Sequence, residues 1–408
     1  MNTLPLNLFL LLVFAHLPCF LVLVPASAKV FLSIDCGSSA LKPYTDENSI
    51  VWVGDDPYVK TGEVHKVNVP ADPANTIFDS KVMDTLRAFP TRNKNCYSID
   101  IAKKPEDNTT PERFLLRTTF YYGNYDNRSS PPSFDLQFNG NHWKHLETTL
   151  NDIWYYEVVF SLKKGNNINV CLAQTKPGDV PFISALEVRS LDSDAYSYIP
   201  SDYPLIFIDR TAFGTNKFTR YPEDSFDRLW SWIGPPGNTS TLTRVRSNSP
   251  SIKLDSVDKP PEMVLRTSLM RMNSSEDIFY RDDQNPKGPI NFNAYFSEVI
   301  KLDSSQKRSF DIVINNNIDN SMIVPANPVI PPYGGALEVH IVNVTTFNSS
   351  FLIDFKRTND STLPSLINAL EVYIIGGKLV EGTNSKDGNF LPYVYSLIKK
   401  TRGCNQLF

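Results

Sequence analysis

An internal repeat is the feature that most constrains how this chain can fold. The segment FDLQFNG at residues 134–140 returns as FDIVINN at residues 310–316, which is 176 positions later. Each copy alternates apolar and polar residues and then ends in Asn-Gly or Asn-Asn, as expected of a half-buried strand that enters a tight turn. Phe120 in FYYGNYD and Phe296 in NAYFSEV stand at equal distances before the two copies. Because the flanks agree as well, we interpret the chain as a duplication of one folding unit.

Further landmarks recur in the same order. YTDENSIVW (residues 44–52) parallels YPEDSFDRLW (221–230), and ISALEV (183–188) parallels INALEV (367–372). The spacing between copies drifts only from 176 to 184 residues, which loop variation explains. A chain of 408 residues also exceeds what one hydrophobic core usually serves, whereas two units of roughly 170 residues fit the usual domain size.

The composition favours an all-β fold. The chain has 30 Pro and 18 Gly, and short strand patterns follow one another between Pro, Gly and Asn turns. No segment shows a long helical period. We therefore predict two tandem antiparallel β-sandwich domains, at residues 29–195 and 196–377, followed by an irregular tail at residues 378–408.

Residues 1–28 carry no charged side chain and end in Ala-Ser-Ala after a long apolar run. We interpret them as a secretory signal peptide that is cleaved before Lys29; the alternative is an uncleaved membrane anchor. The net charge of −4, without a block of either sign, offers no footprint for nucleic acid. The expected location is therefore outside the cell.

Secretion predicts acceptor sites for N-linked glycans. Seven Asn-X-Ser/Thr sequons are present, and such sites are expected on solvent-facing loops. They are Asn108, Asn127, Asn238, Asn273, Asn343, Asn348 and Asn359.

The cysteines leave the disulfide pairing open. Cys19 lies in the signal segment, so Cys36, Cys96, Cys171 and Cys404 remain, and four thiols allow three pairings. We favour Cys36 with Cys96 as the disulfide candidates. Cys171 lies in an apolar strand pattern and could equally be a buried free thiol.

The sequence predicts neither an enzyme nor a metal or cofactor site. It lacks the Gly-X-Ser-X-Gly and His-Glu-X-X-His motifs. His142 and His145 are three positions apart on a predicted strand, where they would face opposite sides, so we expect no joint metal binding. Adjacent loop carboxylates such as Asp55 and Asp56 lack the separation that glycoside cleavage requires.

A set of motifs in register resembles a known family. FLSIDCG, YTDE, LRAFP followed by NCY, FYYGNYD, FDLQFNG, VCLA, FISALEV, YPEDSFDRLW, YFSEV and LINALEVY together look like the malectin-like extracellular region of plant leucine-rich-repeat receptor kinases, over residues 30–375. The resemblance implies two malectin-like, jelly-roll type domains with short helices and a recognition role at the cell surface. Family members usually continue into leucine-rich repeats, a transmembrane helix and a kinase. This sequence shows none of these parts, and we interpret it as a shortened form, secreted or held at the outer face of the plasma membrane.

The resemblance also implies a region for ligand binding. Sugar-binding aromatic residues of malectin lie at the strand end that corresponds to FYYGNYD, which points to Tyr122 and Tyr125. With their neighbours Tyr121, Asn124 and Asp126 they offer aromatic rings beside polar groups. The alternative is that alternate members of this run pack in the core.

A second candidate region is the linker between the domains. Tyr196, Tyr198 and Tyr203 fall where the two domains should meet, and clefts between domains are favoured ligand sites. The predicted partners are a cell-wall oligosaccharide or a secreted peptide, with a co-receptor at the plasma membrane. The alternatives are a scaffold without a small ligand and, more remotely, a secreted glycan-active enzyme.

Overall fold

The structure is a computed structural model of the whole chain. It describes residues 30–38, 42–69, 80–101, 112–162, 167–235, 241–272, 278–282, 289–315, 322–323, 327–344 and 351–380. The predicted signal peptide and nearly all of the predicted tail lie outside these residues.

The first domain consists of strands and one short helix. These are β1 (Phe31–Asp35), β2 (Tyr44–Thr45), β3 (Val51–Gly54), β4 (Glu63–Lys66), α1 (Ser80–Met83), β5 (Thr85–Ala88), β6 (Lys94–Asp100), β7 (Glu112–Tyr121), β8 (Ser133–Phe138), β9 (Asn141–Glu147), β10 (Ile153–Leu162), β11 (Asn167–Gln174), β12 (Phe182–Ile183) and β13 (Ala185–Ser190).

The second domain repeats this series. Its elements are β14 (Leu205–Phe213), β15 (Ser231–Ile233), β16 (Leu242–Arg246), α2 (Glu262–Leu265), β17 (Thr267–Arg271), β18 (Ile278–Asp282), β19 (Ile290–Phe296), β20 (Phe310–Asn315), β21 (Met322–Ile323), β22 (Leu337–Val344), β23 (Phe351–Arg357), β24 (Leu366–Ile367) and β25 (Ala369–Ile375). The prediction of an all-β chain with short helices is confirmed.

The sheet topology shows the same arrangement twice. A four-stranded sheet with the order β6-β11-β8-β9 corresponds to one with the order β18-β23-β20-β21, and the three-stranded sheet β12-β5-β4 corresponds to β24-β17-β16. The two copies of the repeated segment form β8 and β20, which hold the same place in their sheets. The predicted tandem architecture is therefore present, while the exact domain boundaries stay predictions.

Two tryptophans show how closely the repeat is kept. The indole Nε1 of Trp52 donates a hydrogen bond to Asp46 Oδ2 at 2.8 Å, and Trp230 Nε1 donates to Asp224 Oδ2 at 2.7 Å. In both domains the aspartate also accepts a hydrogen bond from the backbone N–H two residues later. Both indoles are buried, so the aspartate satisfies a donor that would otherwise be costly to bury.

Two glycines occupy equivalent turns after the first strand of each domain. Gly37 has φ +79° and Gly214 has φ +78°. A Cβ atom would come within 2.3 Å of Leu86 O at the first position and within 2.5 Å of Ser268 O at the second. Only glycine fits both the left-handed backbone and the close approach of the neighbouring strand.

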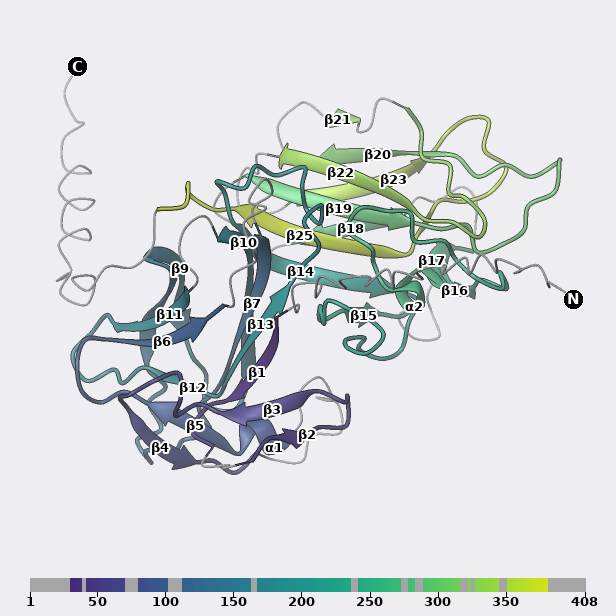
Figure 1. Cartoon of the computed structure of the whole chain (residues 1–408). Coiled ribbons are helices and arrows are strands. Elements are labelled where there is room, and N and C mark those ends of the chain that lie inside the picture. The colour runs from purple at the N-terminus through teal and green to yellow at the C-terminus, as the bar shows by residue number, and fades with distance from the viewer. Residues whose placement is uncertain are drawn as a thin grey trace, which may run out of the picture.

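One sheet runs through both domains. Its strand order is β2-β3-β1-β13-β7-β10-β14-β25-β19-β22, with β15 paired to β14. β10 joins β14 in an antiparallel pair in which Val158 faces Ile206 and Val159 faces Leu205. In Figure 1 the teal strand β14 stands between the strands of the first domain and the yellow-green strands of the second. The two sandwiches therefore share a backbone hydrogen-bonded edge.

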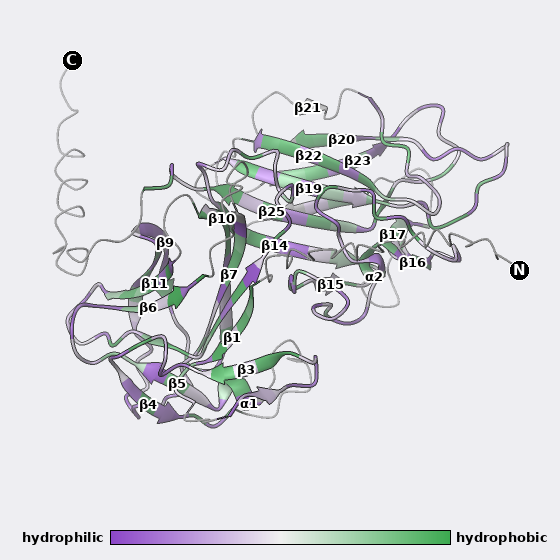
Figure 2. Ribbon diagram, viewed as in Figure 1, coloured by the Kyte–Doolittle hydropathy of each residue, from purple (hydrophilic) through white to green (hydrophobic). Residues whose placement is uncertain are grey.

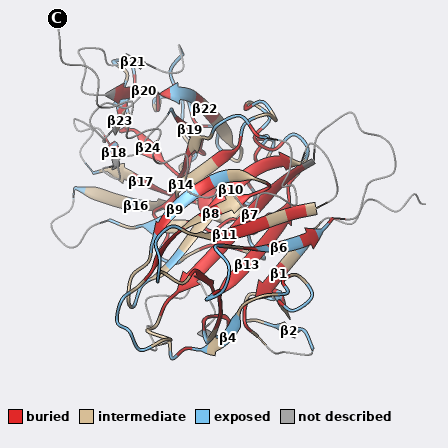
Figure 3. Cartoon of the chain, turned by 90° about the vertical axis from the view of Figure 1, so that its left-hand side faces the viewer, coloured by how far each residue is buried: buried red, intermediate tan, exposed pale blue. Residues whose placement is uncertain are grey.

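Each domain has its own core between this long sheet and its four-stranded sheet. In the first domain Phe134 and Leu136 of β8 belong to the same apolar cluster as Phe114 of β7. In the second, Phe310 of β20 clusters with Phe292 of β19. Figure 2 shows hydrophobic colouring along the strands that face these cores, and Figure 3 shows that the long strands of the first domain are mostly buried.

A third apolar cluster fills the junction. Leu115 and Val159 of the first domain pack there with Leu205 and Tyr373 of the second, and Tyr196 of the connecting segment lies among them. The junction is therefore a packed interface. Among the described residues, no helix has the length and hydrophobicity needed to span a membrane.

Candidate functional site: a pocket at the junction of the two domains

A buried charge network holds the two domains together beneath the pocket. It contains arginines and carboxylates in equal number, all in the core of the junction. Its members are Arg117, Glu157, Glu187, Arg189, Arg210, Arg220, Asp224, Asp227, Arg228 and Glu371.

Asp227 of the second domain is the centre of this network. Its Oδ2 accepts hydrogen bonds from Arg189 Nη2 at 2.7 Å and Arg220 Nη2 at 2.9 Å, and its Oδ1 accepts from Arg220 Nε at 2.9 Å. Arg117 Nη1 lies 3.3 Å from the same Oδ2. Since Arg117 and Arg189 belong to the first domain, one carboxylate pairs with arginines of both domains.

A second chain of ion pairs runs along the shared sheet. Glu157 of β10 accepts hydrogen bonds from Arg117 Nε at 2.7 Å and from Arg210 Nη1 at 2.8 Å. Arg210 of β14 in turn donates from Nε to Glu371 of β25 at 2.6 Å. Each guanidinium bridges two carboxylates, so the strands are tied together in sequence by charge as well as by backbone pairing.

Asp227 and Arg220 keep their charges in this buried network. Burial by itself would raise the pKa of Asp227, but Arg189, Arg220 and Arg117 lower it well below its usual range. Burial would lower the pKa of Arg220, yet the neighbouring Glu187 and Asp227 raise it. Buried charges persist only when they are paired in this way.

The junction pocket opens above this network and has a volume of about 230 Å³. The first domain contributes the loop between β2 and β3, and the second contributes the segment that follows β14 and the tryptophan before β15. The lining residues are Glu47, Asn48, Lys217, Phe218, Thr219, Arg220, Glu223, Leu229 and Trp230.

Two polar groups of the pocket lack a partner. Asn48 Nδ2 and Thr219 Oγ1 are buried and make no hydrogen bond. Such groups usually cost free energy unless something satisfies them. One residue comes from each domain, so a ligand that bonds both groups, once their side chains turn toward the cavity, would bridge the junction. The amide N–H requires an acceptor, such as a carbonyl oxygen, and the hydroxyl can bond a donor or an acceptor.

The walls of the pocket are held rigidly. Arg220 is fixed by Asp227 and Glu187, and Trp230 is fixed by its bond to Asp224. The rim is charged and more exposed: Lys217 Nζ lies 3.5 Å from Glu223 Oε1, and Glu47 is exposed. A rigid floor under polar, partly apolar walls is typical of a preformed binding site.

The tyrosines predicted for sugar binding separate into two groups. Tyr121 and Tyr122 are buried, with exposed fractions of 2% and 1%. Tyr121 donates a hydrogen bond to Asn68 O at 3.3 Å, and the Tyr122 hydroxyl bonds Asp126. Both rings therefore pack in the core, whereas the alternative interpretation expected only alternate members of this run to lie there.

The remaining residues of that group lie at the surface of the strand end. Asn124, Tyr125 and Asp126 are partly exposed, and the Tyr125 ring packs against His65 with a centroid separation of 4.8 Å. Asn124 Oδ1 accepts a hydrogen bond from the backbone N–H of Ser129 at 2.8 Å. A sugar could reach one face of Tyr125 at most, and the role predicted for this group stays a prediction.

The linker tyrosines differ from one another. Tyr196 is fully buried and donates from its hydroxyl to Glu371 Oε1 at 3.0 Å, so it builds the junction. Tyr198 is partly buried and stacks on His340 with a centroid separation of 4.0 Å. Tyr203 is 36% exposed. None of the three lines the junction pocket.

The predicted disulfide is wrong. Cys96 pairs with Cys171, and Cys36 is a buried free thiol. The reason is strand register: β6 and β11 are neighbours, and Cys96 stands directly opposite Cys171. Cys404 lies outside the described residues.

The expectation for the paired histidines also rested on a wrong premise. Where β8 pairs with β9, the strand register shifts by one residue between Leu136 and Gln137. As a result, His142 and His145 both lie close to Asp135. His145 Nδ1 lies 2.6 Å from Asp135 Oδ1. A β-bulge therefore brings to one face two side chains that a regular strand would separate.

Three of the predicted glycan acceptors can be located. Asn127, Asn343 and Asn359 are exposed, as the prediction requires. Their use as acceptors stays a prediction. Asn108, Asn238, Asn273 and Asn348 lie outside the described residues.

Comparisons with known proteins agree on one family. The family model described as the malectin-like domain matches residues 34–375. An Arabidopsis thaliana protein, "Uncharacterized protein At1g24485", is 34% identical over 381 residues, which cover 91% of this chain and 70% of the relative. The "Probable LRR receptor-like serine/threonine-protein kinase At1g51860" of the same plant is 30% identical over 91% of this chain and 40% of its own length. The chain thus spans about two fifths of that receptor kinase.

Solved structures share the fold at low identity. The ectodomain of ANX2 from Arabidopsis thaliana superimposes with a TM-score of 0.69 at 18% identity, covering 88% of this chain and 100% of the other. FER in the crystal structure of the plant peptide RALF23 with FER and LLG2 gives a TM-score of 0.64 at 16% identity, over 87% of this chain and 98% of that one. The family match and the relatives together show that this chain belongs to the malectin-like domain family, with the two-domain fold of receptor-kinase ectodomains.

Proposed function

We propose that this chain is an extracellular recognition module that binds a secreted peptide, and that the junction pocket receives part of that peptide. The observation that carries the proposal is the pair of unpartnered groups, Asn48 Nδ2 and Thr219 Oγ1, in a pocket built from both domains. A peptide offers a carbonyl oxygen at every residue, which suits the amide donor. Exposed Glu47 and Glu223 outnumber Lys217 at the rim, which favours a neutral or basic peptide segment.

The structural relatives support a peptide as the first ligand class to test. FER was crystallised with the peptide RALF23 and with LLG2. By analogy, the partners of this module are a secreted peptide and a co-receptor at the plasma membrane. An exclusively scaffolding role, in which a co-receptor binds without any small ligand, is the competing function.

An extracellular location suits the chemistry of the chain. The chain contains the disulfide Cys96–Cys171, and disulfides persist in oxidising compartments but are rare in the cytosol. Three of the predicted glycan acceptors, Asn127, Asn343 and Asn359, are exposed. We place the module outside the cell, secreted or at the outer face of the plasma membrane.

We also propose that the module binds without catalysing a reaction. Among the residues that line the pocket there is no Cys, His or Ser to act as a nucleophile or a general base. The two pocket carboxylates, Glu47 and Glu223, are both exposed and lack the burial that tunes a catalytic acid. Turnover of any cell-wall glycan by purified protein would overturn this part.

The test is a titration of purified protein with secreted peptides and, in a parallel arm, with cell-wall oligosaccharides. We expect saturable peptide binding that falls about 5- to 30-fold in Thr219→Val and in Asn48→Ala, because each loses about 1–2 kcal/mol of hydrogen bonding. Tyr125→Ala is the matched control at the rival site and should bind normally.

Other outcomes discriminate between the proposals. Sugar binding that is lost in Tyr125→Ala but kept in Thr219→Val would place the ligand at the strand end and refute the junction pocket. Capture of a membrane co-receptor without any response to peptides or sugars would favour the scaffold.

A further inference from the structure

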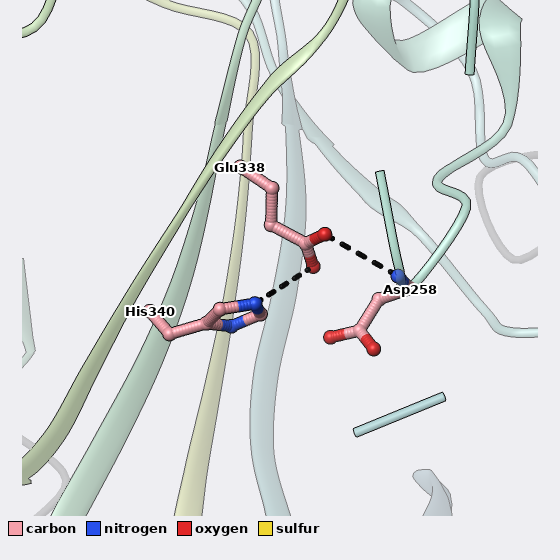
Figure 4. A group of neighbouring side chains, drawn as sticks. All are labelled: Asp258, Glu338 and His340. Atoms are coloured by element: carbon pink, nitrogen blue, oxygen red, sulfur yellow. Dashed lines mark hydrogen bonds and ion pairs between the residues drawn. The ribbon is translucent and has the colours of Figure 1, made fainter. Parts of the chain in front are cut away.

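A second cluster at the junction combines three potential metal ligands. Asp258 lies on the loop before α2, and Glu338 and His340 lie on β22. One ligand atom of each lies within 4.8 Å of the other two. Figure 4 shows the Glu338 carboxylate joined to the His340 ring and to the backbone nitrogen of Asp258. The cluster does not share residues with the junction pocket.

The carboxylates in this cluster are short of positive partners. The Glu338 side chain is only 6% exposed, and its Oε1 has no hydrogen-bond partner, although it lies 3.6 Å from His340 Nε2. Asp258 is fully buried. Among the described residues, no Lys or Arg side chain forms an ion pair with either carboxylate. Two acidic groups thus lie together where burial of an unpaired charge is costly.

The hydrogen bonds around His340 orient its ring for metal binding. Asn293 Nδ2 donates to Asp258 Oδ2 at 2.9 Å, which fixes the amide so that its Oδ1 faces His340 Nδ1 at 3.3 Å. With the amide in this orientation, the tautomer that fits is the one with the proton on Nδ1, which leaves Nε2, on the side of Glu338, free to bind a metal ion. Metal-binding histidines use this arrangement, in which the second ring nitrogen donates to a neighbouring acceptor.

We propose that Asp258, Glu338 and His340 form a binding site for Zn²⁺. One imidazole nitrogen with two carboxylate oxygens is a donor set that suits zinc, whereas calcium prefers oxygen ligands alone. Four ligand atoms arranged as a tetrahedron at roughly 2.1 Å from a zinc ion lie about 3.4 Å from one another. The Glu338–His340 distance of 3.6 Å already fits, and the Asp258 carboxylate, whose ligand atom lies within 4.8 Å of the other two, would have to move closer on binding the ion.

The site would connect the domain linker to the second domain. The Asp258 carboxylate also accepts a hydrogen bond from the backbone N–H of Tyr196 at 2.5 Å, and the His340 ring stacks on Tyr198. A bound ion would hold these contacts in place and so stiffen the junction. The 26% exposed side chain of His340 leaves a path from solvent and room for a water as the fourth ligand.

The experiment measures zinc binding to the full chain after chelator treatment and removal of the chelator. We expect one Zn²⁺ per chain by calorimetric titration, a rise in Tm on adding zinc, and no comparable effect of Ca²⁺. Glu338→Gln and His340→Ala should each weaken zinc binding at least 10-fold. The matched control is His145→Ala, which removes a surface histidine beside Asp135 and should leave the affinity unchanged.

The outcomes are decisive in each case. Absence of zinc binding by the folded wild-type chain would overturn the proposal. Binding that keeps its wild-type affinity in both Glu338→Gln and His340→Ala would also overturn it, whatever the result for His145→Ala. The wild-type titration alone tests the site even where a variant fails to fold. Peptide binding at the junction pocket is measured separately, so failure of either proposal does not decide the other.

Discussion

Replacing Asp227 by Asn tests whether the buried charge network stabilises the junction. Asn keeps the shape of the side chain but removes one charge and turns one acceptor into a donor that faces a guanidinium group. The fully buried site would then lack a negative charge to pair with its three arginines, Arg189, Arg220 and Arg117. Removing one partner from a buried ion pair costs about 3–5 kcal/mol.

The effect should be large compared with the total stability. At about 2–4 °C per kcal/mol for a domain of this size, Asp227→Asn should lower Tm by roughly 6–20 °C. The assay is urea unfolding together with a thermal melt, with Asp152→Asn as the control. Asp152 is exposed, and its backbone N–H, not its carboxylate, donates the hydrogen bond to Thr149 Oγ1. The free energy of unfolding of the control should therefore stay within about 0.5 kcal/mol of the wild-type value.

The pH dependence gives an independent check. The pKa of Asp227 is lowered, so its contribution to stability is fully present above the usual aspartate value near 3.8 and is lost only as pH falls through the lower folded value. The deficit of Asp227→Asn should therefore be the same at pH 5 and at pH 8. A deficit below about 1 kcal/mol, or one equal to that of Asp152→Asn, would refute this account of the network.

Three further perturbations follow from the structure. Replacing Cys96 and Cys171 together by Ala should lower the free energy of unfolding by about 4 kcal/mol, because the disulfide closes a loop with a sequence separation of 75. The measurement is chemical denaturation, in which the double variant should unfold at the same denaturant concentration as the reduced wild-type protein. Burial raises the pKa of Asp35 to about 6, so the folded state binds a proton more tightly than the unfolded one, and stability should fall by about 2 kcal/mol between pH 4 and pH 6.5. That slope should disappear in Asp35→Asn, and its persistence there would assign it to another group. Gly214→Ala should cost on the order of 2 kcal/mol or more, because its φ is +78° and the new Cβ would meet Ser268 O; a melt within 1 °C of the wild type would contradict the steric argument.

The duplicated β architecture could be predicted because the repeat preserves structural roles along the chain. β8 and β20 carry the same alternating pattern, and Trp52 and Trp230 each keep an aspartate six positions earlier. Local spacing of this kind is visible in the sequence. The fold class and the family resemblance both followed from it.

The site could not be predicted, because it depends on how strands and domains pair. Cys96 and Cys171 are neighbours only through strand register, and Asn48 and Thr219 line the same pocket only because the two domains meet there. One signal was available in the sequence: Arg117 and similar arginines interrupt strongly apolar strands. Such residues indicate buried ion pairs, although the sequence does not name their partners.

The central claim is that the shared sheet and the charge network hold the two domains as one rigid body with a preformed pocket. The direct measurement is the distance distribution between two spin labels, attached to Cys introduced at exposed Val64 of β4 and Lys356 of β23. Cys404 is replaced by Ser in all samples, and Cys36 is fully buried and should remain unlabelled. We expect a single narrow distribution in the wild-type background that broadens in Asp227→Asn. A broad or bimodal distribution in the wild-type background would contradict the claim.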